Sequence, residues 1–245
     1  MVLSRRQCFA LIIPALAVGQ APQKRVLKIV CVGGHPDDPE SGCGGTLARY
    51  AALGHAVTVI YLTRGEAGIP GKSHDEAAAI RSAECVAACK ILGAQPVFAG
   101  QIDGATVVDT KVAESFGRLL SAERPDVVFT QWPIDTHLDH QAASTLTFRA
   151  WLAAGRGFEL YFYEVNLGSQ TMGFHPTDYV DITAVREKKK AALFAHKSQN
   201  GEEIYRGHHE PMETFRGREA GTAAAEAFVH LARATGASRL PGLGL

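Results

Sequence analysis

Segments typical of buried strands alternate with segments typical of helices along the first two thirds of the chain. Strand segments lie at 27–34, 55–63, 96–103 and 126–133, and each precedes a helix segment, at 41–54, 74–93, 110–125 and 137–155. This order is typical of a mostly parallel sheet with helices on both faces. We therefore predict an α/β protein with a single Rossmann-like domain.

The rest of the chain extends this domain. Residues 158–166 and 178–183 have the pattern of strands, 185–200 that of a helix, and 223–234 that of a last helix after a polar stretch. No repeat, linker or low-complexity segment divides these residues, so the predicted domain covers 22–245.

Residues 1–21 have the three-part pattern of an export signal. Arg5 and Arg6 precede an apolar stretch, 8–18, and small residues precede a cut after Ala21. The arginine pair resembles a twin-arginine signal, and the apolar stretch is too short to span a membrane as a helix. We expect export to the periplasm or the cell exterior, with no membrane span after the signal is removed. A retained anchor or a general secretory signal is the alternative.

Charge and cysteine content exclude several classes of protein. The 25 basic and 25 acidic residues balance, which gives no general affinity for nucleic acid or anionic membrane. The four cysteines of the predicted domain lack zinc-knuckle spacing and are expected to be small core residues; they are Cys31, Cys43, Cys85 and Cys89. The sequence GGHPDD lacks the G-x-G-x-x-G spacing of a dinucleotide loop.

A first polar cluster follows the first predicted strand. His35, Asp37 and Asp38 come directly after 27–34, at the carboxyl end where open α/β sheets bind ligands. Asp38 as a helix cap would explain one carboxylate, but not a histidine with two.

A second cluster follows the fourth predicted strand. His137 and His140 are three residues apart, so they face the same side of a first helical turn. With the first cluster they would converge above one sheet edge. Three nitrogen or oxygen ligands with an open position suit a catalytic zinc ion, and further acid or base groups nearby suit hydrolysis.

These motifs resemble the PIG-L/LmbE family of metal-dependent N-acetylglucosaminyl deacetylases. The resemblance lies in HPDD (35–38), GCGGTLA (42–48), LTRGEAG (62–68) and HLDHQ (137–141), with weaker likeness in RSAEC, FYEV, DYVDIT, AHKSQ and AEAF. It implies a hydrolase that removes an N-acetyl group from an N-acetylglucosamine-type amino sugar or its conjugate.

The resemblance also implies a role for each clustered residue. His35, Asp38 and His140 match the zinc ligands, although another divalent ion such as Fe²⁺ suits the same atoms. Asp37 matches the general base, and His137 matches the group that steadies the oxyanion, if charged, or protonates the leaving amine. Asp139 is either the partner that orients a histidine or a solvated helix residue.

Other residues match the family less specifically. Arg64, Glu66 and Arg81 are candidates for substrate binding, with a structural ion pair as the alternative for the first two. His196 matches a family motif but is as well explained as a structural histidine, and His208 and His209 fall in the polar stretch.

One departure concerns the first cluster. Many family members have glutamate after the second aspartate, where this chain has Pro39 followed by Glu40. Since glutamate is not among the implied ligands, the metal site is expected to survive, and details of substrate contact are in doubt.

The predicted partner is a small molecule or oligosaccharide that carries an N-acyl amino sugar; a homo-oligomer stays open. Two other functions are compatible with the motifs: a zinc amidase that cleaves a larger acyl or peptide-like conjugate, and a carbohydrate-binding relative without catalysis.

Overall fold

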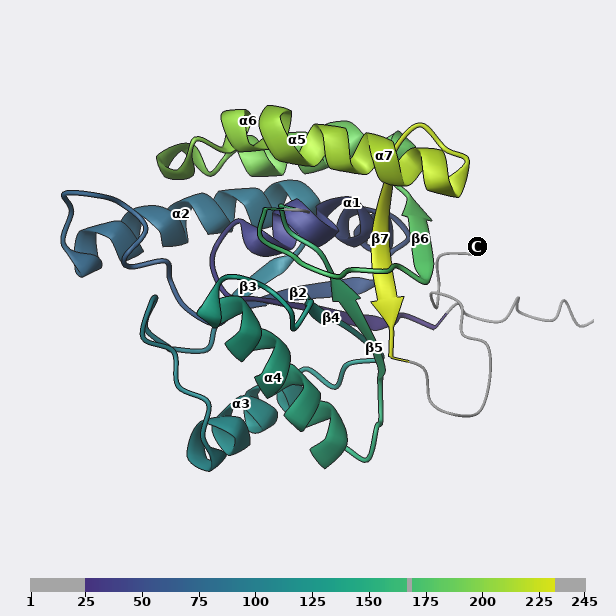
Figure 1. The fold of residues 1–245 in the computed structure, drawn as a ribbon. Helices are drawn as coiled ribbons and strands as arrows, with labels where there is room; N and C mark the ends of the chain where they lie inside the picture. Colours follow the sequence, from purple (N-terminus) through teal and green to yellow (C-terminus); the bar gives the residue numbers. More distant parts are fainter. Residues whose placement is uncertain (1–24, 167–168, 232–245) are drawn as a thin grey trace, which may run out of the picture.

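The computed structural model describes residues 25–166 and 169–231 (Figure 1). The predicted signal, 1–21, lies outside these residues. One sheet has the strand order β3-β2-β1-β4-β5-β7-β6. Its strands are β1 (Lys28–Gly33), β2 (Ala56–Tyr61), β3 (Gln95–Phe98), β4 (Val127–Gln131), β5 (Glu159–Tyr163), β6 (Asp178–Asp181) and β7 (Ala225–His230).

Helices cover both faces of this sheet. They are α1 (Asp38–Ala52), α2 (His74–Leu92), α3 (Thr110–Ala122), α4 (Leu138–Ala153), α5 (Arg186–Phe194), α6 (Gly201–Ile204) and α7 (Glu210–Ala220). Short 3₁₀ turns lie at Thr183–Val185 and Lys197–Gln199, and a π-helical turn at Tyr205–His209. α1 and α2 cover one face and α3 and α4 the other. α5, α6 and α7 form a further tier, in which α5 packs on α1 and α2 and α7 packs on β6 and β7 (Figure 1).

The parallel part of the sheet confirms the predicted fold class. β1 pairs in parallel with β2 and with β4, and β3 and β5 extend the sheet in parallel on either side. Chain order therefore reverses between β1 and β4, and a crevice opens at the carboxyl ends of strands at such a reversal.

The prediction of a helix over 223–234 was wrong for the described part of that segment. Residues Ala225–His230 form β7, which pairs antiparallel with both β5 and β6. Its alanines favour a helix in isolation, but pairing on both sides overrides that weak preference. The polar stretch before it also holds regular structure, in α6, the π-helical turn and α7.

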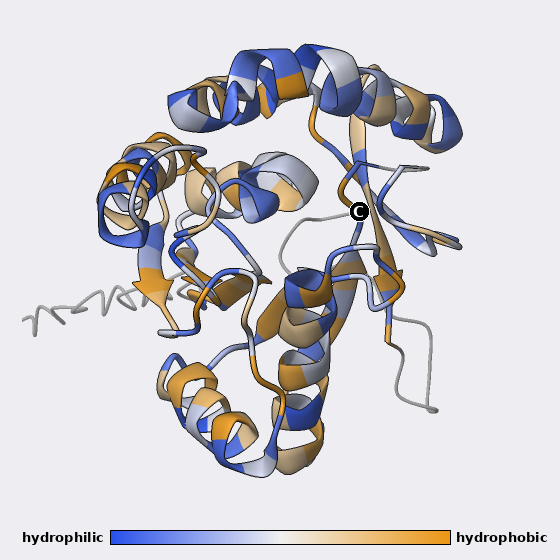
Figure 2. Ribbon diagram, turned by 60° about the vertical axis from the view of Figure 1, so that its left-hand side comes forward, coloured by the Kyte–Doolittle hydropathy of each residue, from blue (hydrophilic) through white to orange (hydrophobic). Residues whose placement is uncertain are grey.

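The strands form the most hydrophobic part of the molecule, whereas the tier of α5–α7 is largely hydrophilic outside (Figure 2). One buried cluster lies between the sheet and α1 and α2, and another between the sheet and α3 and α4. Cys31, Cys43, Cys85 and Cys89 are buried and free, as expected. Within the described ranges, no helix has the length and apolar character needed to cross a membrane.

α1 lies unusually close to the end of β5, and this close packing fixes the position of its first turn. A Cβ atom on Gly42 would lie 2.3 Å from the Tyr163 ring, so only glycine permits this approach. From β7, the Glu226 carboxylate accepts hydrogen bonds from the backbone N–H groups of Gly45 and Thr46. The sequence that opens α1 is therefore held rigidly over the ends of β1 and β4.

Candidate metal centre

A cavity of about 470 Å³ lies at the carboxyl ends of β1 and β4. The first predicted cluster follows β1 and the second follows β4, so the reversal of strand order brings both clusters to its wall. Its described lining consists of His35, His137, His140, Asp37, Asp38, Asp103, Asn166, Gln170, Gln199, Arg81, Ala67, Gly68 and Gly104.

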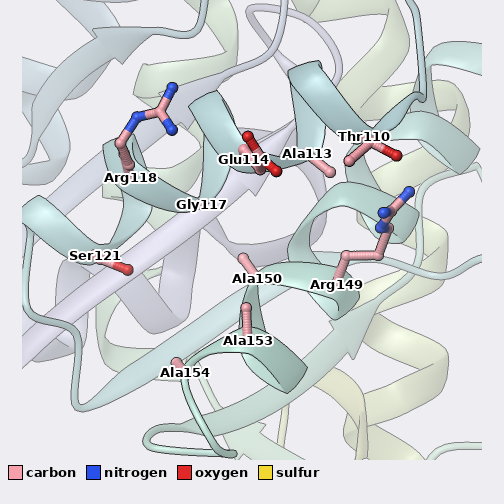
Figure 3. Close-up of a pocket in the computed structure, with 10 residues that line it drawn as sticks. All are labelled: Thr110, Ala113, Glu114, Gly117, Arg118, Ser121, Arg149, Ala150, Ala153 and Ala154. Carbon is pink, nitrogen blue, oxygen red and sulfur yellow. The ribbon is translucent and has the colours of Figure 1, made fainter.

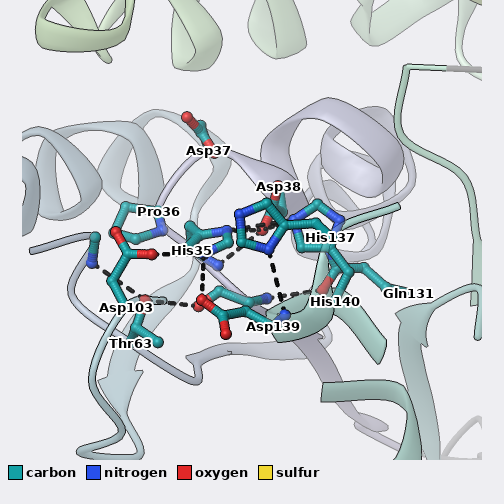
Figure 4. A network of polar contacts seen from close by, with 12 residues as sticks. His35, Pro36, Asp37, Asp38, Thr63, Asp103, Gln131, His137, Asp139 and His140 are labelled. Carbon is teal, nitrogen blue, oxygen red and sulfur yellow. Dashed lines mark hydrogen bonds and ion pairs between the residues drawn. The ribbon is translucent and has the colours of Figure 1, made fainter. Parts of the chain in front are cut away.

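Three ligand atoms form a nearly equilateral triangle at this wall (Figure 4). The Asp38 Oδ2 atom lies 3.1 Å from His35 Nδ1 and 3.1 Å from His140 Nε2, and the two nitrogens are 3.3 Å apart. Ligands about 2.1 Å from a tetrahedral zinc ion are separated by roughly 3.4 Å. The three side chains therefore fit a zinc ion with an open fourth position.

The protonation of these groups reflects their close approach. Burial by itself lowers the pKa of His140, but Asp38 and Asp135 raise it to about 9. Burial raises the pKa of Asp38, whereas His140 and His35 hold it well below its ordinary value. Because a metal ligand must be a neutral imidazole, metal binding at this triangle would release protons.

A carboxylate lies behind each of the two histidines. Asp139 Oδ2 lies 3.0 Å from His35 Nε2, and Asp135 Oδ2 lies 3.1 Å from His140 Nδ1. A proton on each outer nitrogen leaves the lone pair of the inner nitrogen in the triangle. Asp139 is almost completely buried, which excludes the alternative of a solvated helix residue.

Asp139 is itself fixed by the chain after β3. The Gly104 N–H and the Thr106 hydroxyl donate to its two oxygens at 2.8 and 2.6 Å. Burial raises the pKa of Asp139, but these bonds and the His35 contact lower it overall, well below the ordinary range.

Asp139→Asn is expected to weaken zinc affinity by about 10- to 100-fold, because it replaces a carboxylate beside His35 Nε2 with a neutral carboxamide, which raises the basicity of the ring less. Competition with a chromophoric chelator would measure the affinity. Glu114→Gln, on the exposed face of α3, is the control and should bind zinc normally. Unchanged affinity in Asp139→Asn would mean that zinc binding does not depend on the negative charge of Asp139, since Asp103 also lies beside His35 Nε2.

His137 lies on the solvent side of the triangle, where its ring contacts both other histidines. Its centroid is 4.5 Å from that of His35 and 4.8 Å from that of His140. Burial, with the charges of those two histidines, lowers its pKa. Its Nδ1 atom accepts a hydrogen bond from the Asp139 N–H at 3.2 Å, so the neutral ring carries its proton on Nε2. His137 is thus a neutral donor here, whereas the sequence led us to consider a charged one.

Asp37 lies at the wall of the cavity, apart from the network of the histidines (Figure 4). Arg81 Nη2 donates to its Oδ2 atom at 3.1 Å and to the Pro36 carbonyl at 2.6 Å. Burial raises the pKa of Asp37, and the Arg81 charge opposes part of that rise. Arg81 therefore lines the cavity, as expected, but its contacts are with the loop that carries Asp37.

The other two candidates for substrate binding are not among the residues that line the cavity. Arg64 Nε lies 3.2 Å from Glu66 Oε1, and Glu66 also accepts from the backbone N–H groups of Arg64 and Asp103. These contacts match the structural alternative, and a role in substrate binding stays a prediction.

The remaining histidines occupy different environments. His196 is fully buried with its Nε2 atom 3.2 Å from Glu40 Oε1. His208 is exposed and His209 buried, and neither lines the cavity. Of these three histidines, His196 is thus the one with a contact near the site, to Glu40.

Several residues of the site were not predicted from the sequence. Asp103 lies 3.1 Å from His35 Nε2 and follows β3, so the strand-end rule that identified the two clusters also applies to it. Asp135 lies two residues before His137, in the same loop. The carboxamides of Asn166, Gln170 and Gln199 come from irregular segments, and no sequence pattern distinguished them.

A second cavity, of about 460 Å³, is lined by residues of α3 and α4 on the other side of the sheet (Figure 3). Alanines and Gly117 form much of its lining, with Glu114, Arg118 and Arg149 as its charged side chains. Its lining, among the residues that the structure describes, includes no imidazole, so it lacks the ligand set described above.

Comparison with known proteins identifies the family. The sequence profile of the GlcNAc-PI de-N-acetylase (PIG-L) family matches residues 30–151. Diacetylchitobiose deacetylase of Thermococcus kodakarensis is 30% identical over 198 residues, which cover 75% of this chain and 74% of the relative. The chain belongs to the PIG-L family. Its relatives are named deacetylases, and this PIG-L protein is an N-deacetylase of the hydrolase class.

Solved structures share the fold of this PIG-L protein. N,N′-diacetylchitobiose deacetylase from Pyrococcus horikoshii superposes with a TM-score of 0.75 at 24% identity, over 84% of each chain. A 4-carboxy-2-hydroxymuconate hydratase from Pseudomonas putida has the same TM-score at 22% identity, over 87% of this chain and all of the other. Because the second protein is named a hydratase, the fold alone does not select deacetylation.

Proposed function

We propose that this PIG-L protein is a zinc-dependent deacetylase that removes the acetyl group from an uncharged N-acetylglucosamine unit of a small glycoside or oligosaccharide. The observation that carries the proposal is the triangle of His35 Nδ1, Asp38 Oδ2 and His140 Nε2 at the wall of an open cavity. Acid and base groups that are not needed as ligands lie in the same wall, as amide hydrolysis requires.

A zinc ion in the triangle would supply Lewis-acid activation of water and of the amide carbonyl. Asp37 is the residue that accepts the proton of the attacking water. Its raised pKa brings it closer to neutral pH, which favours both proton uptake and later release. Arg81 keeps the Asp37 carboxylate at the cavity wall.

His137 faces the other side of the reacting amide. With its Nδ1 atom occupied by the Asp139 N–H, its Nε2–H is the donor available to an oxygen that becomes negative. The neutral ring would become an anion if it gave this proton away, so the proton that Asp37 accepted from the water is the one that passes to the leaving amine, which then departs as a neutral group.

The cavity lining supports an uncharged sugar. Among its described residues, Arg81 is the one guanidinium or ammonium group, and Asp37 and two backbone carbonyls already engage it. Three carboxamides, of Asn166, Gln170 and Gln199, also line the cavity; each already makes a hydrogen bond within the protein, but Asn166 Oδ1 has no partner among the described residues and can accept from a sugar hydroxyl group. An anionic substituent would find no free cationic side chain there. The diacetylchitobiose named for two relatives is a substrate of this uncharged kind.

We also propose that the protein acts outside the cytoplasm. This rests on the signal-like pattern of 1–21 and directs the choice of substrate toward cell-wall fragments, polymer-derived oligosaccharides and secreted glycosides.

The test is free-amine and acetate release by the mature protein from a panel of N-acetylated sugars. The panel pairs N-acetylglucosamine and diacetylchitobiose with their 6-phosphates, with and without a chelator, and metal analysis of the purified protein identifies the ion. We expect chelator-sensitive turnover of the neutral sugars and at least about 10-fold weaker kcat/KM for the phosphates, a penalty of about 1.4 kcal/mol.

Other outcomes favour the alternatives. Release of longer acids but not of acetate would favour an amidase for larger acyl conjugates. Sugar binding that a chelator leaves unchanged, with no amine released, would favour a carbohydrate-binding protein.

A further inference from the structure

Asp37 has a main-chain conformation that few residues other than glycine adopt. Its φ is +107° and its ψ −31°, at the turn that begins α1. Such a conformation is strained in a residue with a Cβ atom, and it persists only where surrounding contacts hold it. The contacts that hold Asp37 therefore determine where its carboxylate lies.

Glu40 holds the main chain of Asp37. Its side chain is fully buried, and its Oε2 atom accepts a hydrogen bond from the Asp37 N–H at 3.2 Å. The other oxygen, Oε1, accepts from the Tyr61 hydroxyl at 2.6 Å and lies 3.2 Å from His196 Nε2. Tyr61 is the last residue of β2 and His196 follows α5, so two separate elements fix the Glu40 carboxylate.

A second, independent contact holds the side chain of Asp37. Arg81, from α2, donates to the Asp37 carboxylate and to the Pro36 carbonyl. Its guanidinium packs against Gly65, where an added Cβ atom would lie 2.4 Å from Nη1. Arg81 thus fixes the carboxylate, while Glu40 fixes the backbone from which it projects.

We infer that Glu40 is a positioning residue that acts on the reaction through Asp37. The inference rests on the proposed function, in which Asp37 accepts the proton of the attacking water. Glu40 does not line the cavity, so it cannot touch the substrate. Its effect is geometric: when the Asp37 N–H loses its acceptor, the strained turn relaxes and the carboxylate moves away from the water. Displacements of about 1 Å at such a group reduce turnover by roughly 10²-fold.

The test compares Glu40→Ala and Glu40→Gln with the natural protein on the best substrate of the panel. Glu40→Ala should lower kcat by about 10²-fold, with KM and zinc content unchanged. Glu40→Gln should restore most of the loss, since its carbonyl can accept from the Asp37 N–H while its amide donates to Tyr61. Normal kcat in Glu40→Ala would overturn the inference, as would loss of zinc, which would mean that Glu40 supports Asp38 instead.

A double-mutant cycle separates positioning from general structural support. In an Asp37→Asn background, Glu40→Ala should cause no further loss of kcat, because the group through which it acts is already gone. Equal losses in both backgrounds would overturn the inference. If Asp37→Asn itself turns over normally, the proposed mechanism and the inference both fail. If Asp37→Asn is inactive and Glu40→Ala is not, only the inference fails.

Two further variants keep the test independent of folding. Glu213→Gln changes an equally buried glutamate, bound by Arg186, Lys189 and Tyr205, that does not line the cavity, and it should leave kcat unchanged. Tyr61→Phe removes the hydroxyl that donates to Glu40 and also contacts Cys89 Sγ, and it should lower kcat several-fold without changing KM. If Glu40→Ala does not fold, normal kcat in Tyr61→Phe overturns the inference.

Discussion

Asp37→Asn is expected to retain zinc and the native fold but to lose turnover by about 10³-fold or more. The variant keeps the size of the side chain, and asparagine tolerates positive φ as well as aspartate does. Its amide still contacts Arg81 through the oxygen, yet it cannot accept a proton. The Asp37 carboxylate does not belong to the triangle of ligand atoms, so metal binding should be unaffected.

Steady-state kinetics with metal analysis of the same samples would measure this effect. The fall should lie in kcat rather than in KM, since the lost interaction arises only in the transition state. Asp75→Asn, at an exposed position in the first turn of α2, removes one negative charge and should behave as the natural protein. Turnover near the natural rate in folded, zinc-loaded Asp37→Asn would exclude Asp37 as the base.

The two clusters could be predicted from the sequence because their position depends on topology alone. Alternation of strands and helices implies parallel strands, and the carboxyl ends of parallel strands meet at one edge. His35 after β1 and His140 after β4 then had to approach each other, and the 3.3 Å between their inner nitrogens is the outcome. Asp103 after β3 obeys the same rule and could have been predicted with them.

The contacts around Asp37 could not be predicted in this way. Arg81 reaches Asp37 because α2 packs beside α1, and Glu40 points inward because Tyr61 and His196 surround it. Both depend on side-chain packing between elements far apart in sequence. The sequence marked Glu40 only as a departure from the family pattern, with no indication of its partner.

The strand β7 shows a different limit. Its sequence, AEAFVH, mixes alanine and glutamate, which favour helices, with phenylalanine and valine, which favour strands. These local preferences were too weak to determine the structure of the segment. Its pairing with β5 and β6 determined it instead. This wrong prediction did not affect the predicted site residues, because they follow β1 and β4, and β5 lies between those strands and β7.

His140→Ala and His137→Ala should have opposite effects on the metal, although the two histidines lie on one helical turn. Ligand atoms of His35, His137 and His140 also come within 4.8 Å of one another, so the geometry would also allow these three histidines to bind a metal ion. The shorter distances of 3.1–3.3 Å favour the set with Asp38 in its place. The Asp139 N–H also donates a hydrogen bond to His137 Nδ1. The other nitrogen of that ring, Nε2, then carries the proton and has no lone pair for a metal ion in the cavity.

We therefore expect His140→Ala to lose zinc on dialysis, and with it the zinc-dependent rise in melting temperature. At 1,000 times the dissociation constant, bound zinc adds about 4 kcal/mol to the free energy of unfolding, and most of this should vanish with one of three ligands. His137→Ala should keep both zinc and the rise, while kcat falls by about 10²-fold. Metal analysis and melting curves, with and without added zinc, would separate the two variants. Loss of zinc from His137→Ala with retention in His140→Ala would reverse the assignment, because the open fourth position would then lie where His140 stands.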